Sequence, residues 1–301
     1  MQSVYALLQS KSDNLDKEEK FLLKSIDKTH EMYALMLQLL VEVRGLEKKH
    51  IQISQKKHLA TPEELSPNSK FVNNQVLQLL EESISLKNFV ETNRLNYWNL
   101  DNEYIHDILM LTKKSNLYAS YMKSSESSFK EDKEFIIALF KEVIAPNEKL
   151  AEYLEDRNIS WVDDIPFVNT WIVKTLNKIK SAQAFHLGNL YKDIDDKKFV
   201  IDLFRKVVLN HTEFEKEVTD KTPNWDTDRI AEIDMILIKM AICEFLKFPS
   251  MPTRVTINEY IEISKDYSTE KSSFFINGVL DKILKDFTTS KRLNKIGRGL
   301  L

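Results

Sequence analysis

Residues 276–282 read Ile-Asn-Gly-Val-Leu-Asp-Lys, which places Gly278 in the middle of an apolar pattern of helical spacing. The apolar positions that define this pattern are Phe275, Ile276, Val279, Leu280, Ile283 and Phe287. A glycine inside a helix costs about 1 kcal/mol relative to alanine, and no turn residue beside it explains its presence. The pattern therefore predicts a helix in which another backbone or a ligand comes close to Gly278.

Helical periodicity extends through the whole chain. Its 301 residues contain only five glycines and seven prolines, which are too few turn residues for a fold made of many short strands. Apolar residues recur every three to four positions through most of the sequence. We therefore predict an all-α protein, with helices over about 17–57, 73–94, 102–123, 130–143 and 166–183 and further helices from 195 to 288.

The predicted helices divide the chain into three regions. Residues 1–194 form an enlarged helical N-terminal subdomain, residues 195–288 form a C-terminal helical subdomain, and residues 289–301 form a basic tail. From Lys282 to Leu301, six basic residues stand against one acidic residue. A segment of this charge can lie on phosphates or remain a solvated terminus.

Composition restricts the compartment and the broad class of protein. The net charge of −3 gives the whole molecule no general attraction for nucleic acid. Cys243 is the single cysteine and falls in an apolar helical stripe, so we expect a buried thiol and a reducing compartment. No apolar run approaches the roughly 18 to 20 residues that span a bilayer, and no signal-peptide pattern opens the sequence. We expect a cytoplasmic protein without membrane contact.

Catalytic signatures are missing from the sequence. There is no Gly-x-Ser-x-Gly motif and no Gly-rich phosphate loop, so we assign no catalytic residue and no cofactor. The tryptophans adjoin helical patterns, and we expect core or inter-helix anchors rather than platforms for base stacking. They are Trp98, Trp161, Trp171 and Trp225.

Two Glu-x-x-His pairs offer a metal-binding alternative. Glu47 with His50, and Glu103 with His106, have the spacing used by helical bundles that hold two irons. Such a site requires two further inward glutamates, and no spacing in this Glu-rich chain identifies them. We therefore assign no metal ligands.

Three motifs, in order along the chain, resemble the signature of the NusB family of bacterial transcription antitermination factors. Residues 228–246 resemble one signature helix of that family. Residues 252–259, Pro-Thr-Arg-Val-Thr-Ile-Asn-Glu, resemble the motif that follows it, and residues 272–282 resemble the family's Phe-Val-Asn-Gly-Val-Leu-Asp-Lys run. Residues 1–5 resemble the later part of the family's first helix. The resemblance covers about 195–287 and the first dozen residues.

The resemblance implies an all-helical, non-enzymatic protein that works without a metal or nucleotide. It implies binding to the boxA element of ribosomal RNA transcripts together with the ribosomal protein NusE, within an RNA polymerase antitermination complex. The region from about residue 17 to 194 is longer than the family's usual N-terminal subdomain. The expected fold is thus a NusB-like helical bundle with an enlarged N-terminal region.

Matching the motifs position by position implies two sets of site residues. Those that correspond to the RNA-facing side of the family are Gln2, Tyr5, Lys271, Ser272 and Phe275. Those on the signature helix that faces NusE are Asp234, Lys239 and Glu244. Phe275 can instead pack in the core, and Glu244 can instead serve as a partner for a buried polar group. Asn277 and Gly278 are assigned to structure, with the asparagine bonding across a close helix contact.

The family also carries an arginine-rich stretch before its first helix, and this sequence has none before Met1. Met1, Val4, Tyr5 and Leu8 already follow helical spacing, which favours an N-terminally shortened form, while the basic tail could supply some phosphate contacts instead. One alternative is a NusB-like scaffold for proteins, in which RNA binding is weakened or lost. The NusB-like module of a ribosomal RNA methyltransferase is disfavoured, because no Gly-rich methyl-donor loop follows the motifs.

Overall fold

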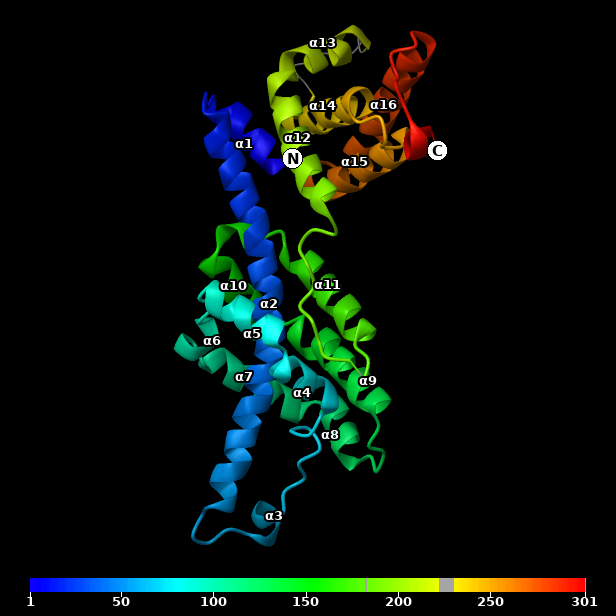
Figure 1. The fold of residues 1–301 in the computed structure, drawn as a ribbon. Helices are drawn as coiled ribbons and strands as arrows, with labels where there is room; N and C mark the ends of the chain where they lie inside the picture. Colours follow the sequence, from blue (N-terminus) through cyan, green and yellow to red (C-terminus); the bar gives the residue numbers. More distant parts are fainter. Residues whose placement is uncertain (182, 222–229, 301) are drawn as a thin grey trace. The chain divides into compact units, whose positions relative to one another are not determined.

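The computed structural model describes residues 1–181, 183–221 and 230–300, and every regular element in that part of the chain is helical (Figure 1). This confirms the predicted all-α class. The helices are α1 (Gln2–Ser10), α2 (Leu15–Gln55), α3 (Pro62–Leu65), α4 (Gln75–Glu82), α5 (Ile84–Thr92), α6 (Tyr97–Leu100), α7 (Glu103–Lys114), α8 (Asn116–Lys123), α9 (Phe129–Leu139), η1 (Phe140–Ile144), α10 (Glu148–Arg157), η2 (Ile159–Trp161), α11 (Ile165–Lys178), α12 (Ile194–Leu209), α13 (His211–Lys221), α14 (Glu232–Lys247), α15 (Thr253–Tyr267), α16 (Ser272–Thr289) and η4 (Gly297–Leu300).

Two compact units make up the chain. The first combines Met1–Leu23 with Tyr191–Leu301, and the second consists of Lys24–Leu190. Helix α2 begins in the first unit, and most of its length belongs to the second. Among the described residues, no helix is both long and apolar enough to cross a membrane.

The first unit is built around α14, which packs against α1, α12, α13, α15 and α16 (Figure 1). Neighbours on so many sides require a helix that is apolar around most of its circumference, and the sequence from Ile236 to Phe245 supplies this pattern. Cys243 is fully buried in this core, and burial raises the pKa of its thiol to about 12. It is thus the small buried side chain that the sequence predicts.

Gly278 does not lie at a close helix contact, contrary to the sequence prediction. Helix α16 turns Ile276, Val279 and Leu280 into the core and leaves Gly278 exposed. A Cβ atom added at Gly278 would meet no atom within 4 Å. Asn277 is exposed as well, so it does not bond across such a contact.

We expect Gly278→Ala to raise the free energy of unfolding by about 0.5 to 1 kcal/mol. Alanine lowers the conformational entropy of the unfolded chain, and its side chain fits at an exposed position inside a helix. Urea denaturation followed by circular dichroism would measure the change. Gly297 provides the matched control, since its φ of 53° disfavours alanine. Gly297→Ala should therefore not raise the free energy of unfolding. If Gly278→Ala lowered the free energy of unfolding instead, the result would support the close contact that the sequence predicts.

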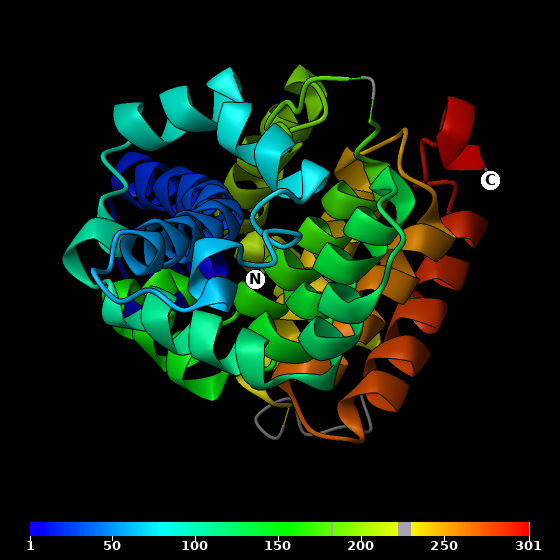
Figure 2. The ribbon, with the colours of Figure 1, turned by 90° about the horizontal axis from the view of Figure 1, so that it is seen from below.

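The second unit surrounds α2. Figure 2 shows α2 in blue, seen nearly end-on, with cyan and green helices of the same unit around it. The structural bounds Leu15–Gln55 agree with the predicted helix over 17–57. Trp98 and Trp161 are fully buried and donate their indole N–H groups to the carbonyl oxygens of Leu35 (2.9 Å) and Lys28 (2.8 Å) on α2.

The two buried indoles confirm the predicted role of these tryptophans as inter-helix anchors. Trp171 is only partly buried, but it packs against the core of the second unit and stacks on Tyr33 of α2, so it is an inter-helix anchor as well. Trp225 lies outside the described residues.

A buried polar network joins α4, α8 and α9 within the second unit. Tyr121 donates its hydroxyl to Asp132 (2.6 Å), and the other carboxylate oxygen of Asp132 accepts from the backbone and side-chain N–H groups of Gln75 (2.9 and 3.2 Å). Asn74 caps α4 and donates to the Tyr121 hydroxyl (3.2 Å). Because buried polar groups are costly when unpaired, this network specifies how the three helices meet.

Candidate functional site

Helix α14 carries the three charged residues that the sequence assigns to NusE binding, and the structure buries all of them. Asp234 is 5% exposed, Lys239 is 5% exposed and Glu244 is 6% exposed. Each of the three pairs with a neighbouring element of the first unit. Direct contact with a partner would therefore require these side chains to leave internal hydrogen bonds, and their role in NusE binding stays a prediction.

Asp234 links the first turn of α14 to the turn between α15 and α16. The Ser268 hydroxyl donates to its carboxylate (2.6 Å), and Ser272 lies 2.9 Å from the Ser268 hydroxyl oxygen. Two residues earlier on α14, Glu232 accepts a hydrogen bond from the side chain of Gln9 at the end of α1 (2.6 Å). The N-terminal end of α14 thus contacts α1 directly and is linked through Ser268 to Ser272 at the start of α16.

Glu244 accepts hydrogen bonds from two hydroxyl groups of α15, those of Thr256 (2.7 Å) and Tyr260 (2.7 Å). Burial raises the pKa of the Glu244 carboxyl, while these two donors and the nearby Lys295 ammonium act in the opposite direction. Burial and the adjacent carboxylate raise the pKa of Tyr260 as well. The alternative role of Glu244 as a partner for buried polar groups matches these contacts.

Lys239 forms an ion pair with Glu215 of α13, with the ammonium 2.7 Å from the carboxylate. The lysine side chain is nearly inaccessible, whereas that of Glu215 is about half exposed. Removing Glu215 would leave the Lys239 ammonium buried without its partner. The pair therefore holds α13 against α14.

The residues assigned to RNA differ in their accessibility. Gln2 and Lys271 are exposed, and Tyr5 is 37% exposed. Ser272 is 3% exposed and lies within hydrogen-bonding distance of Ser268 and Thr269. Phe275 packs partly against the core, in keeping with the alternative that the sequence left open.

Sequence reasoning missed Phe274, which is 81% exposed and lies three residues after Lys271. Its side chain falls outside the stripe formed by Ile276, Val279 and Leu280, so helical spacing alone could have identified it as an outward aromatic residue. An exposed aromatic ring beside a lysine at a helix N-terminus can stack on a base while the cation and the helix dipole attract phosphate.

The basic tail packs against the end of α14. Lys295 donates to the carbonyl oxygens of Glu244 (3.0 Å) and Phe248 (2.9 Å), as expected for a cation at a helix C-terminus. A Cβ atom at Gly299 would lie 2.0 Å from the carbonyl oxygen of Pro249, so the close backbone approach occurs here rather than at Gly278. Arg292 pairs with Glu217 (2.8 Å). Two basic residues of the tail are thus occupied by internal contacts.

The two Glu-x-x-His pairs lie close together in the second unit. The imidazole rings of His50 and His106 are 5.8 Å apart, but Glu47 pairs with the Lys113 ammonium at 2.5 Å, a charge that would repel a metal cation. Throughout the described part of the chain, no group of three or more His, Cys, Asp or Glu side chains is arranged to hold a metal ion.

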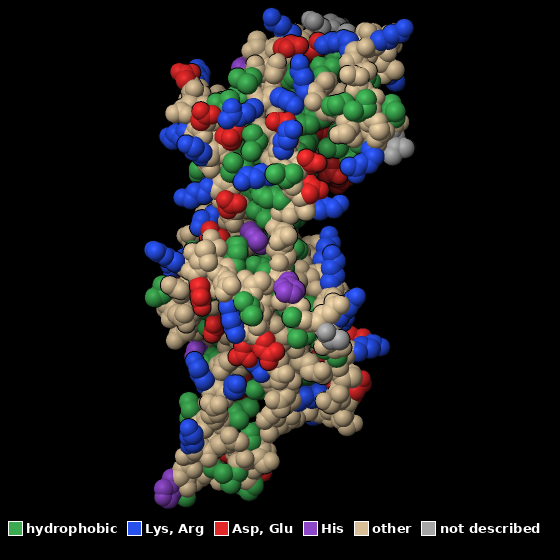
Figure 3. All heavy atoms as spheres, viewed as in Figure 1, with side chains coloured by type: hydrophobic (Ala, Val, Ile, Leu, Met, Phe, Trp, Pro, Cys, Tyr) green, Lys and Arg blue, Asp and Glu red, His purple; other side chains and the backbone are tan. Residues whose placement is uncertain are grey.

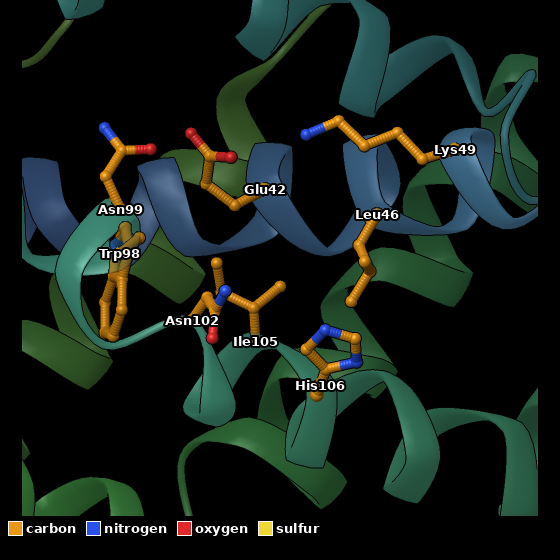
Figure 4. A pocket seen from close by; sticks show the side chains of 8 residues that line it. All are labelled: Glu42, Leu46, Lys49, Trp98, Asn99, Asn102, Ile105 and His106. Atoms are coloured by element: carbon orange, nitrogen blue, oxygen red, sulfur yellow. The ribbon is translucent and has the colours of Figure 1, made fainter.

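A pocket of about 140 Å³ lies beside the same helices, between α2 and the segment from α6 to α7. In Figure 4, Leu46 points toward His106, whereas Glu42 and Lys49 extend away from that imidazole. The polar groups therefore do not converge on one point, as they do in a typical ligand site.

Comparison with known proteins places the motif-bearing helices in one family. The sequence profile of the NusB family matches residues 167–285. The Transcription antitermination protein NusB of Salinibacter ruber is 43% identical over 112 residues, which are 37% of this chain and 70% of that protein. The proteins of the same name from Chloroherpeton thalassium and Finegoldia magna are 39% identical over 122 residues and 40% identical over 89 residues.

The matched residues cover 40% of this chain and 58% of the Chloroherpeton protein, and 28% of this chain and 65% of the Finegoldia protein. No solved structure matches the chain. The profile match begins inside α11 and includes α12, α14 and α15 and most of α16. The chain belongs to the NusB family.

Proposed function

We propose that the protein is a non-enzymatic transcription antitermination factor that binds boxA-type RNA together with the ribosomal protein NusE. Membership of the NusB family supports the antitermination role. The observation that carries the RNA proposal is the start of α16, where Lys271 and Phe274 are both exposed. This start lies in the unit whose helices bear the family motifs.

The chemistry of the α16 start suits a single-stranded RNA. The Lys271 ammonium can neutralise a phosphate, and the positive end of the 18-residue helix acts in the same direction. Phe274 offers a ring on which a base can stack. Gln2 and Tyr5 on α1 remain proposed contacts, since both are accessible.

We further propose that NusE binds the same unit and that the RNA polymerase antitermination complex is the setting in which both ligands are used. Asp234, Lys239 and Glu244 would then act by fixing the helices beneath the contact surface, because their side chains are already hydrogen-bonded inside the unit. Exposed neighbours of these residues would touch the partner.

We expect Phe274→Ala to weaken binding to boxA RNA by roughly tenfold, because one stacked base contributes about 1 to 3 kcal/mol. Lys271→Glu should weaken binding and reduce the slope of log affinity against log salt by about 0.7, the value for one phosphate contact on a single strand. Fluorescence anisotropy at two salt concentrations, with and without NusE, would measure both changes.

Leu209→Ala and Lys198→Glu on α12 are matched controls, since Leu209 is 70% exposed and Lys198 is exposed. Equal losses in the controls and the α16 variants would contradict an RNA site at α16. If the wild-type protein binds NusE but no boxA RNA, the alternative of a NusB-like protein scaffold replaces the RNA proposal.

A further inference from the structure

The second unit contains a pocket of about 360 Å³ between α11 and the residues that follow this helix. Its volume falls in the range of about 300 to 1,000 Å³ typical of small-molecule sites. Tyr33 from α2 and Trp171 and Thr175 from α11 line it, together with Lys178 and Lys180. No acidic side chain is among the described residues that line this pocket.

One wall of the pocket is aromatic. The rings of Tyr33 and Trp171 stack with their centroids 3.9 Å apart and their planes at 4°. Tyr33 is fully buried, and its hydroxyl oxygen lies 2.9 Å from that of Thr175. This hydrogen bond holds the Tyr33 ring in place against Trp171. Trp171 is only partly buried, and Phe167, one turn earlier on α11, is 60% exposed. Part of the aromatic surface is therefore accessible.

The segment that follows α11 is held against α2 beside the aromatic stack. His30 on α2 hydrogen-bonds to the Gly188 carbonyl oxygen at 2.7 Å. A Cβ atom at Gly188 would lie 3.2 Å from the Tyr33 hydroxyl oxygen and 3.5 Å from the Trp171 indole nitrogen. Glycine at this position therefore leaves the space beside the aromatic stack open.

Lysines surround the aromatic surface. Lys174, Lys178 and Lys180 are exposed, and no salt bridge involves any of them in the described part of the chain. Phe167, Trp171, Lys174 and Lys178 recur at spacings of four, three and four residues, which places them on one face of α11. Figure 3 shows basic side chains along the edge of this unit where α11 lies.

We infer that this face of α11 is a second RNA-binding site, which takes single-stranded RNA with a base against Trp171 and phosphates on the lysines. Accessible aromatic rings beside unpaired cations are the features that bind single strands with little sequence preference. An acidic protein segment would use the lysines but gain little from a flat aromatic wall. The inference rests on the proposed function and extends RNA binding to the second unit.

The test uses the full chain and a short fluorescein-labelled oligouridine, which lacks a boxA sequence. Trp171→Ala should lower its affinity roughly tenfold or more, since base stacking is lost. The triple variant Lys174→Glu, Lys178→Glu and Lys180→Glu should reduce the salt slope by about 2, because each phosphate contact on a single strand contributes about 0.7. Photocrosslinking of 4-thiouridine RNA should modify the peptide that contains Trp171.

The control triple variant changes Lys48, Lys56 and Lys87 to glutamate. These lysines are exposed and lie in the same unit, and their substitution changes the net charge by the same amount. Equal losses in both triple variants, or crosslinks only outside α11, would overturn the inference. Displacement of the RNA by polyglutamate without a Trp171 crosslink would assign the face to an acidic protein segment instead.

The boxA experiment separates this inference from the proposed function. If oligouridine binding does not depend on α11 while boxA binding still depends on Lys271 and Phe274, the second site is wrong and the proposed function stands. If neither RNA binds, both fail. The lysine variants keep the test informative if Trp171→Ala fails to fold.

Discussion

Replacing Glu244 with alanine is expected to lower the free energy of unfolding of the first unit by about 3 to 5 kcal/mol. The substitution removes the acceptor of two buried hydrogen bonds, from the hydroxyl groups of Thr256 and Tyr260. Hydrogen bonds to a charged group contribute about 1.5 to 3 kcal/mol each, and unpaired buried donors add their desolvation cost. Hydrogen exchange of the amides in α14 and α15 would measure the loss in this unit separately from the other.

Two further substitutions distinguish structural loss from loss of partner binding. Glu244→Gln keeps an acceptor of similar shape and should cost less than Glu244→Ala. Glu262→Ala on α15 is the surface control, because Glu262 is exposed and pairs with Lys265 one turn away, a contact worth less than about 1 kcal/mol. If Glu244→Ala left hydrogen exchange unchanged while abolishing NusE binding, Glu244 would belong to the partner interface as the sequence motif predicts.

The burial of Asp234, Lys239 and Glu244 shows where motif matching and helix geometry diverge. The three residues are spaced five apart, and each step of five residues turns about 140° around an α-helix. They therefore point in three different directions, and no single partner surface could contact all of them. This angular spacing can be read from the sequence. The reason that each of the three sides of α14 carries a charged residue is visible only in the structure, where a different neighbouring element supplies the partner on each side.

Local patterns predicted the helical class and the course of α2, because periodic apolar residues record which positions face a core. The same periodicity predicted α12 and α13, and the ordered motifs fall on α14, α15 and α16. Tertiary contacts explain the failures. Gly278 lies between apolar residues in the sequence, yet it is on the solvent side of α16. Gly299 lies in the tail and meets Pro249, 50 residues earlier in the chain. Periodicity within one helix carries no information about such distant contacts.

The same reasoning applies to the candidate RNA sites. Lys271 was found from a motif, and Phe274 could have been found from its position outside the apolar stripe of α16. The pocket at Trp171 could not, because its stacked wall requires Tyr33 from α2, 138 residues earlier in the chain. The stack on Tyr33 confirms the expectation that Trp171 is an inter-helix anchor, and its side chain is nevertheless partly exposed.

A second large effect is expected in the other unit, where Asp132→Ala should lower the free energy of unfolding by about 3 to 5 kcal/mol. Asp132 is 5% exposed and accepts from the Tyr121 hydroxyl and from two N–H groups of Gln75. Because the carboxylate also lies in the first turn of α9, its loss removes a favourable interaction with that helix dipole. Hydrogen exchange of α4 and α9 would report the change.

The network also predicts how Asp132 and Tyr121 couple. Tyr121→Phe alone should cost about 1 to 2 kcal/mol, because the Asp132 carboxylate keeps its bonds to Gln75. In the double variant Asp132→Ala and Tyr121→Phe, the loss in free energy of unfolding should be smaller than the sum of the two single losses, since both substitutions remove the same hydrogen bond. Glu134→Ala on the same helix is the control, because Glu134 is exposed and its pair with Lys130 spans 3.9 Å. Strictly additive losses, or an equal loss in Glu134→Ala, would show that the three helices are held by apolar packing and that the carboxylate network does not specify their contact.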